Sequence, residues 1–172
     1  MLLIPLDNNP NLDFATIPIV GLSAHPIQTI GILLFLTVSA GIIQQTLGLG
    51  ALFVTKSIGF YLLGFLVLFA SLPPRLTRSR FGAANQATLL RGSLVALLFG
   101  FVAEPAVSLT TWLVVIIGAV CIGLDGLDGW LARREGLVSW WGAQFDMETD
   151  ALSILVLALL AWQFDKAGIW VL

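Results

Sequence analysis

The chain of 172 residues is 58% hydrophobic and only 10% charged, with a mean hydropathy of +0.98. Soluble domains carry about 25% charged residues, so a protein this apolar cannot cover its own surface. The composition therefore predicts an all-α integral membrane protein. Eight Lys and Arg residues and a net charge of −2 provide no basic surface for nucleic acid. Cys121 is the single cysteine, which excludes an intrachain disulfide, and it is interpreted as an apolar helix residue.

The hydrophobic residues fall into five stretches that follow an N-terminal arm. This arm, residues 1–26, contains four prolines and is expected to be irregular. Each stretch is close to the roughly 20 apolar residues that a helix needs to span a bilayer, so about five transmembrane helices are expected. The predicted helices cover residues 27–43, 51–72, 87–103, 111–133 and 140–164.

Arginine residues orient the predicted helices. Arg75, Arg78 and Arg80 lie between the second and third helices, and Arg133 and Arg134 lie between the fourth and fifth. The turn between the third and fourth helices carries no Lys or Arg. Because basic residues concentrate in cytoplasmic loops, the arginine-bearing loops are expected in the cytoplasm. In a bacterium the membrane would be the plasma or inner membrane.

Four aspartates interrupt the last two apolar stretches. A helical residue turns by about 100°, so Asp125 and Asp128 are separated by about 60° on one helix face, and Asp146 and Asp150 by about 40° on the next. The chain reverses near residues 135–137. An antiparallel hairpin is therefore expected to bring the two carboxylate pairs face to face near the cytoplasmic surface.

This acidic cluster favours a metal site. Four unpaired carboxylates would repel one another, and most would protonate. Oxygen ligands suit Mg²⁺, Mn²⁺ or Ca²⁺, and no His or Cys is placed to favour zinc. Four carboxylates are enough for two metal ions, the arrangement that clamps attacking and leaving oxygens in phosphoryl chemistry. An ionisable cluster inside a membrane is in general a candidate functional site.

Small residues and one arginine flank the aspartates. Gly129, Ala132 and Gly142 leave room for a flat group or for phosphates, although for the glycines taken alone tight helix packing is the favoured interpretation. Arg133 is either a cytoplasmic anchor or a guanidinium that binds phosphate oxygens. Glu148 lies about 200° from Asp146 around the helix and is expected to face away.

The residues together resemble the signature of the CDP-alcohol phosphotransferase family, D-x2-D-G-x2-A-R-x8-G-x3-D-x3-D. Upstream, the pattern N-x2-T-x2-R resembles an element that often opens the first core helix of this family, and it consists here of Asn85, Thr88 and Arg91. Every fixed position of the signature is met, by Asp125, Asp128, Gly129, Ala132, Arg133, Gly142, Asp146 and Asp150.

The resemblance implies a phospholipid-biosynthesis enzyme that takes a CDP-linked lipid or alcohol, transfers its phosphoalcohol or phosphatidyl part to an acceptor hydroxyl and releases CMP. It implies two Mg²⁺ or Mn²⁺ ions held by Asp125, Asp128, Asp146 and Asp150, with Asp150 also the catalytic general base. It further implies contact with membrane lipids and a homodimer. The implied nucleotide-binding residues are Asn85, Thr88, Asp128, Gly129, Ala132, Arg133 and Gly142.

The resemblance covers about residues 82–166. The family core has six membrane helices, and residues 82–172 supply three of them, the first half of that core. We therefore expect a catalytic core truncated at its C-terminus, as in a fragment of a longer protein, that a partner or further helices would complete. Residues 27–75 are expected to form a separate two-helix membrane segment that packs or anchors.

Two other functions remain open on the residues alone. A divalent-cation transporter or channel would also place carboxylates within a membrane. However, the carboxylates are expected to cluster at one membrane face and not to line an ion pathway across the bilayer. A transporter or channel function also does not explain Gly129 and Arg133. The other alternative is a catalytically inactive membrane scaffold. The identity of the donor and of the acceptor does not follow from the sequence.

Overall fold

The computed structural model describes the backbone of residues 25–70, 83–135 and 140–171, and side chains within residues 29–67, 86–126 and 146–171. The described residues form five α-helices and one short 3₁₀ helix, which confirms the all-α prediction. Residues 1–24 of the predicted arm lie outside the described residues. The elements are α1 (His25–Leu47), α2 (Phe53–Ala70), α3 (Ala83–Gly100), α4 (Ser108–Glu135), α5 (Trp140–Gln163) and η1 (Ile169–Val171).

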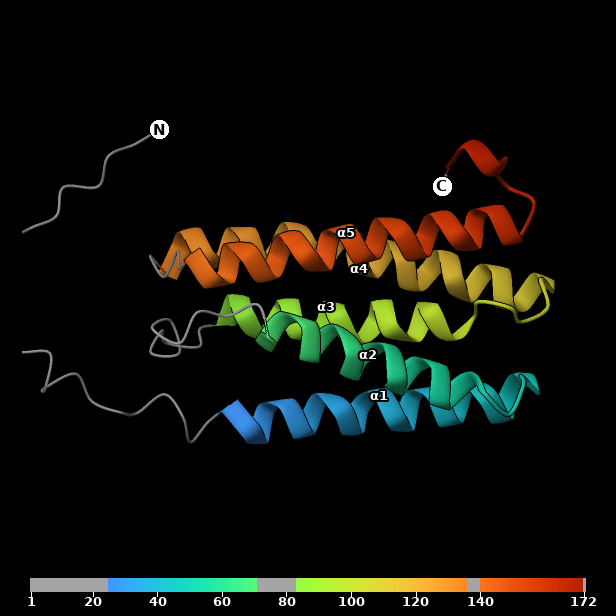
Figure 1. Ribbon diagram of the computed structural model, residues 1–172, viewed down its shortest axis with the longest axis horizontal. Helices are drawn as coiled ribbons and strands as arrows, with labels where there is room; N and C mark the ends of the chain where they lie inside the picture. The colour runs from blue at the N-terminus through green and yellow to red at the C-terminus, as the bar shows by residue number, and fades with distance from the viewer. Residues whose placement is uncertain (1–24, 71–82, 136–139, 172) are drawn as a thin grey trace, which may run out of the picture.

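Helix α3 is the central element of the bundle. It packs against each of the other four α-helices, whereas α4 and α5 make few contacts with each other within the described residues. In Figure 1, α1 and α2 lie on one side of α3, and α4 and α5 lie on the other. Residues 95–98 of α3 are all buried. Four consecutive buried residues are typical of a helix that is surrounded by other helices.

Helix α2 packs closely against the end of α3. The rings of Phe53 and Phe101 meet edge to face with centroids 4.9 Å apart, and those of Phe60 and Phe99 stack at 4.2 Å. A Cβ atom at Gly100 would lie 2.9 Å from Cε2 of Phe53, so glycine permits this close approach. The N-terminal helices are therefore packed directly on α3, the helix against which α4 and α5 also pack.

The outward faces of the bundle are apolar. Large hydrophobic side chains are exposed on α1, α2, α4 and α5, among them Leu34, Trp112 and Ile154. Two segments, Thr29–Leu47 and Ser108–Gly126, are long and apolar enough to cross a membrane. Exposed apolar surfaces of this extent are typical of contact with lipid or with a partner. The number of five spans and the cytoplasmic orientation remain predictions.

Candidate metal centre

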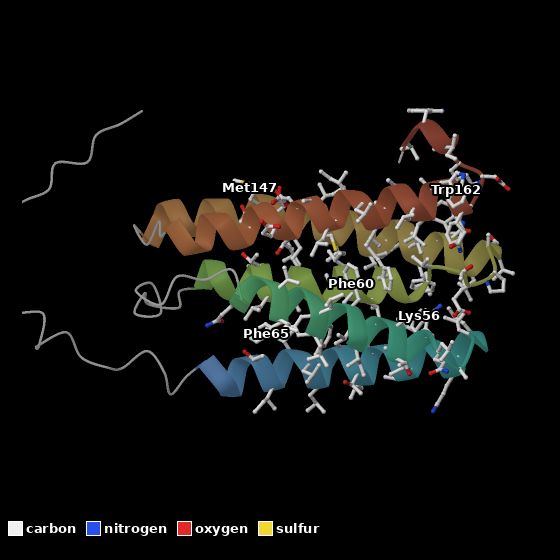
Figure 2. The ribbon with its side chains drawn as sticks, viewed as in Figure 1. Lys56, Phe60, Phe65, Met147 and Trp162 are labelled. Carbon is white, nitrogen blue, oxygen red and sulfur yellow. The ribbon has the colours of Figure 1, made fainter. Side chains whose placement is uncertain are left out.

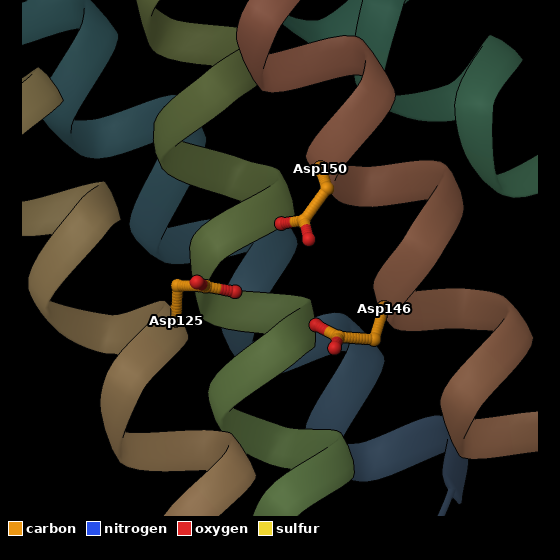
Figure 3. Close-up of side chains that lie close together, drawn as sticks. All are labelled: Asp125, Asp146 and Asp150. Carbon is orange, nitrogen blue, oxygen red and sulfur yellow. The ribbon is translucent and has the colours of Figure 1, made fainter.

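Three aspartates from two helices converge at one point of the bundle. Asp125 lies on α4, and Asp146 and Asp150 lie on α5. Figure 3 shows the three side chains pointing toward one another, and one carboxylate oxygen from each lies within 4.8 Å of those of the other two. The aspartates that helical spacing predicted to meet are thus together in these three cases. Their roles as metal ligands and as general base remain predictions.

The helices explain why the carboxylates meet. Asp146 and Asp150 are four residues apart, so both project from the same face of α5. Asp125 faces them from α4, and because α4 and α5 pack mainly on α3, the carboxylates share the space above that helix. The side chains of Asp125, Asp146 and Asp150 are 46%, 39% and 46% exposed. The cluster is therefore open to a ligand from outside the bundle.

Arg91 of α3 lies beneath the three carboxylates. Its side chain is 1% exposed and forms ion pairs with all three aspartates. Nη1 pairs with Oδ1 of Asp125, and Nη2 lies 2.5 Å from Oδ1 of Asp146 and 3.0 Å from Oδ1 of Asp150. The sequence analysis named this residue only as part of the N-x2-T-x2-R pattern and assigned it no role. The available signal was a charge in the middle of an apolar helix, which has to be neutralised when it is buried.

The other predicted site residues lie on the same three helices. Thr88 is buried on α3, one turn before Arg91. Glu148 is exposed and is not part of the carboxylate cluster, as its position around α5 predicted. The remaining residues have helical backbones, but their side-chain surroundings lie outside the described residues: Asn85 on α3, Asp128, Gly129, Ala132 and Arg133 on α4, and Gly142 on α5.

The chemistry of the donor set fits a hard divalent cation. All three side chains offer carboxylate oxygens, which Mg²⁺, Mn²⁺ and Ca²⁺ prefer. One guanidinium faces three carboxylates, so the group keeps a net negative charge when all of them are ionised. A divalent cation would neutralise that charge. The described side chains account for three of the four aspartates in the predicted ligand set.

The family model described as CDP-alcohol phosphatidyltransferase matches residues 81–172, which is more than half of the chain. The matched segment contains α3, α4 and α5 and therefore the whole acidic cluster with Arg91. The match confirms the resemblance that the signature predicted. No curated protein and no solved structure matches the chain significantly.

Proposed function

We propose a specific reaction for this chain, which belongs to the CDP-alcohol phosphatidyltransferase family. Family membership implies a phosphotransferase of phospholipid synthesis. The protein transfers a phosphoalcohol or phosphatidyl group from a CDP-alcohol to an acceptor hydroxyl and releases CMP. The observation that carries this proposal is the convergence of Asp125, Asp146 and Asp150 inside the segment that the family model matches.

Metal binding is assigned to the acidic cluster. The family is typically dependent on divalent metals. Asp125, Asp146 and Asp150 would hold Mg²⁺ or Mn²⁺, and Asp128 joins them by its spacing of three residues from Asp125. When bound, two such ions supply charge stabilisation for a diphosphate and its leaving oxygen.

Asp150 acts as the general base. The acceptor hydroxyl oxygen forms a bond to the β-phosphorus of the donor, and the bond from that phosphorus to the bridging oxygen of CMP breaks. The hydroxyl proton passes to a carboxylate oxygen of Asp150, and CMP leaves with the electron pair of the broken bond. The side chain of Asp150 is 46% exposed, so an acceptor can approach it.

The nucleotide lies beside the cluster in this proposal. Glycine and alanine on α4 and α5 leave space for phosphates close to the backbone, and the Arg133 guanidinium binds phosphate oxygens. The nucleotide-binding set is Asn85, Thr88, Asp128, Gly129, Ala132, Arg133 and Gly142.

The bundle sits in the membrane with the acidic cluster toward the cytoplasm. The apolar outward faces and the two helices long enough to span support the membrane location. The arginines that precede α3 and the two at the end of α4, Arg133 and Arg134, support the orientation. The partners are the CDP-linked donor, the hydroxyl acceptor and membrane lipids, and the expected assembly is a homodimer.

Turnover by the full chain tests the reaction. The assay measures CMP released from CDP-diacylglycerol in lipid nanodiscs with Mg²⁺ or Mn²⁺ and a panel of hydroxyl acceptors. We expect Asp150→Asn to lower kcat by at least about 100-fold, because a general base typically contributes 10²–10⁴-fold. Wild-type turnover in this variant, with metal and acceptor saturating, would remove Asp150 from its role.

Asp165→Asn is the matched control. It makes the same chemical change at an exposed position beyond the far end of α5, where the backbone φ is 54°. Asparagine tolerates this left-handed conformation, so turnover should be unchanged.

Metal flux into liposomes without any dependence on nucleotide would instead identify a cation transporter.

A further inference from the structure

We propose that Arg91 is the positioning residue of the metal ligands, an inference that rests on the proposed function. Its guanidinium bridges two helices that make few contacts with each other in the part of the chain that the structure describes: Nη1 binds Asp125 on α4, and Nη2 binds Asp146 and Asp150 on α5. Nη2 also donates to the backbone carbonyl of Asp146 at 3.3 Å. Arg91 therefore determines how far apart the carboxylates of α4 and α5 lie.

The exposed fractions of the four side chains show which groups lie on the inner side of the cluster and which on the outer side. Arg91 is 1% exposed, whereas the three carboxylates are 39–46% exposed, so the guanidinium occupies the inner side of the cluster and the carboxylates its outer side. Because the carboxylates lie on the outer side, they are accessible to a cation that approaches from outside the bundle.

The chemistry of arginine suits this task better than that of lysine. A guanidinium is planar and presents its N–H donors in a fixed fork, so one side chain orients several carboxylates at once. A lysine ammonium carries the same charge on a flexible stem without that geometry. Without the guanidinium, three neighbouring carboxylates would repel one another and separate or protonate.

Two roles for Arg91 predict opposite results. If Arg91 only neutralised charge, its removal would leave the site more negative, and metal ions would bind more tightly. If Arg91 orients the ligands, its removal weakens binding despite the added negative charge. Groups that orient metal ligands typically change affinity by 10–100-fold when they are mutated.

Mn²⁺ binding to the full chain in nanodiscs distinguishes these roles. Electron paramagnetic resonance of free Mn²⁺ gives the Kd of wild type, Arg91→Gln and Arg91→Lys. We expect the Kd to rise at least about tenfold in both variants, because neither retains the fork. Lys166→Gln is the matched control, since it removes a positive charge at an exposed position beyond the far end of α5 and should leave the Kd unchanged.

The outcomes separate this inference from the proposed function. If wild type binds Mn²⁺ and Arg91→Gln binds it as tightly or more tightly, the positioning role of Arg91 is wrong, while the metal site itself stands. If wild type binds no Mn²⁺, the proposed metal site is wrong, and the positioning role of Arg91 is wrong with it. Circular dichroism identifies the folded variants, and if Arg91→Gln does not fold, the charge-conserving Arg91→Lys decides the question by the same measurement.

Discussion

Nζ of Lys56 on α2 lies 2.8 Å from Oε1 of Glu104 in the turn between α3 and α4. Lys56 also donates to the carbonyl of Val102 at 2.6 Å, and the N–H of Gly50 donates to Oε2 of Glu104 at 2.9 Å. Figure 2 shows Lys56 toward one end of the bundle and Met147, the neighbour of an aspartate of the cluster, toward the other. The ion pair therefore connects the N-terminal helices to the matched segment at the end remote from the cluster.

Replacing Lys56 with methionine should destabilise the fold without changing the acidic cluster. The Glu104 side chain is 6% exposed, and loss of Lys56 removes the positive charge from this buried carboxylate, which keeps the hydrogen bond from the Gly50 N–H. Leaving a buried group without its partner costs about 1–3 kcal/mol. Thermal unfolding in detergent, followed by circular dichroism, measures the loss. The control Lys166→Met removes an exposed lysine and should be neutral, and an unchanged unfolding temperature in Lys56→Met would contradict the structural role of the pair.

The same pair should make stability depend on pH. Burial raises the pKa of the Glu104 carboxyl, but hydrogen bonds from Lys56 and Gly50 and the charge of Lys56 outweigh it and hold the pKa below its ordinary value of 4.5. A carboxyl with a lowered pKa in the folded state contributes stability above its ordinary pKa. That contribution is lost as the pH falls from 4.5 through the folded-state pKa.

Unfolding of wild type and Glu104→Gln between pH 7 and pH 3 checks this dependence. Wild type should lose stability relative to the variant as the pH falls below 4.5, because only wild type carries the titrating carboxyl. Parallel stability curves over this range would show that Glu104 contributes nothing to the pH dependence.

Mn²⁺ should stabilise the wild-type fold through the acidic cluster. A ligand that binds only the folded state adds about 2.7 kcal/mol at a concentration of 100 times its Kd. The rise in unfolding temperature should disappear with EDTA and should be strongly reduced in Asp125→Asn, which lacks one of the clustered carboxylates.

Glu148→Gln is the control for the metal experiment. It removes an exposed carboxylate from the same region of α5 that is not part of the cluster. This variant should keep the full response to Mn²⁺. Equal loss of the response in Glu148→Gln and Asp125→Asn would mean that general acidity, rather than the cluster, attracts the ion.

Local patterns were sufficient to predict the helices and the faces on which the aspartates lie. Apolar runs of suitable length predict helices because a segment that spans a membrane has to form all its backbone hydrogen bonds internally. Asp146 and Asp150 share a face because the helical period depends on neighbouring residues alone. The signature across α4 and α5 predicted the family for the same reason, since its spacing is a property of the chain and not of its packing.

The hairpin also predicted that Asp125 faces Asp146 and Asp150, but the packing of both helices on α3 placed Arg91 beneath them. Arg91 follows the last helix of the N-terminal segment and precedes Asp125 by 34 positions, and no periodic pattern links residues so far apart. Its contact with α4 and α5 arises because α3 is central and both helices pack on it. The pairing of Lys56 with Glu104 depends likewise on how α2 packs against α3. Helical periodicity determines the direction of a side chain on its own helix, whereas packing between helices determines its partner.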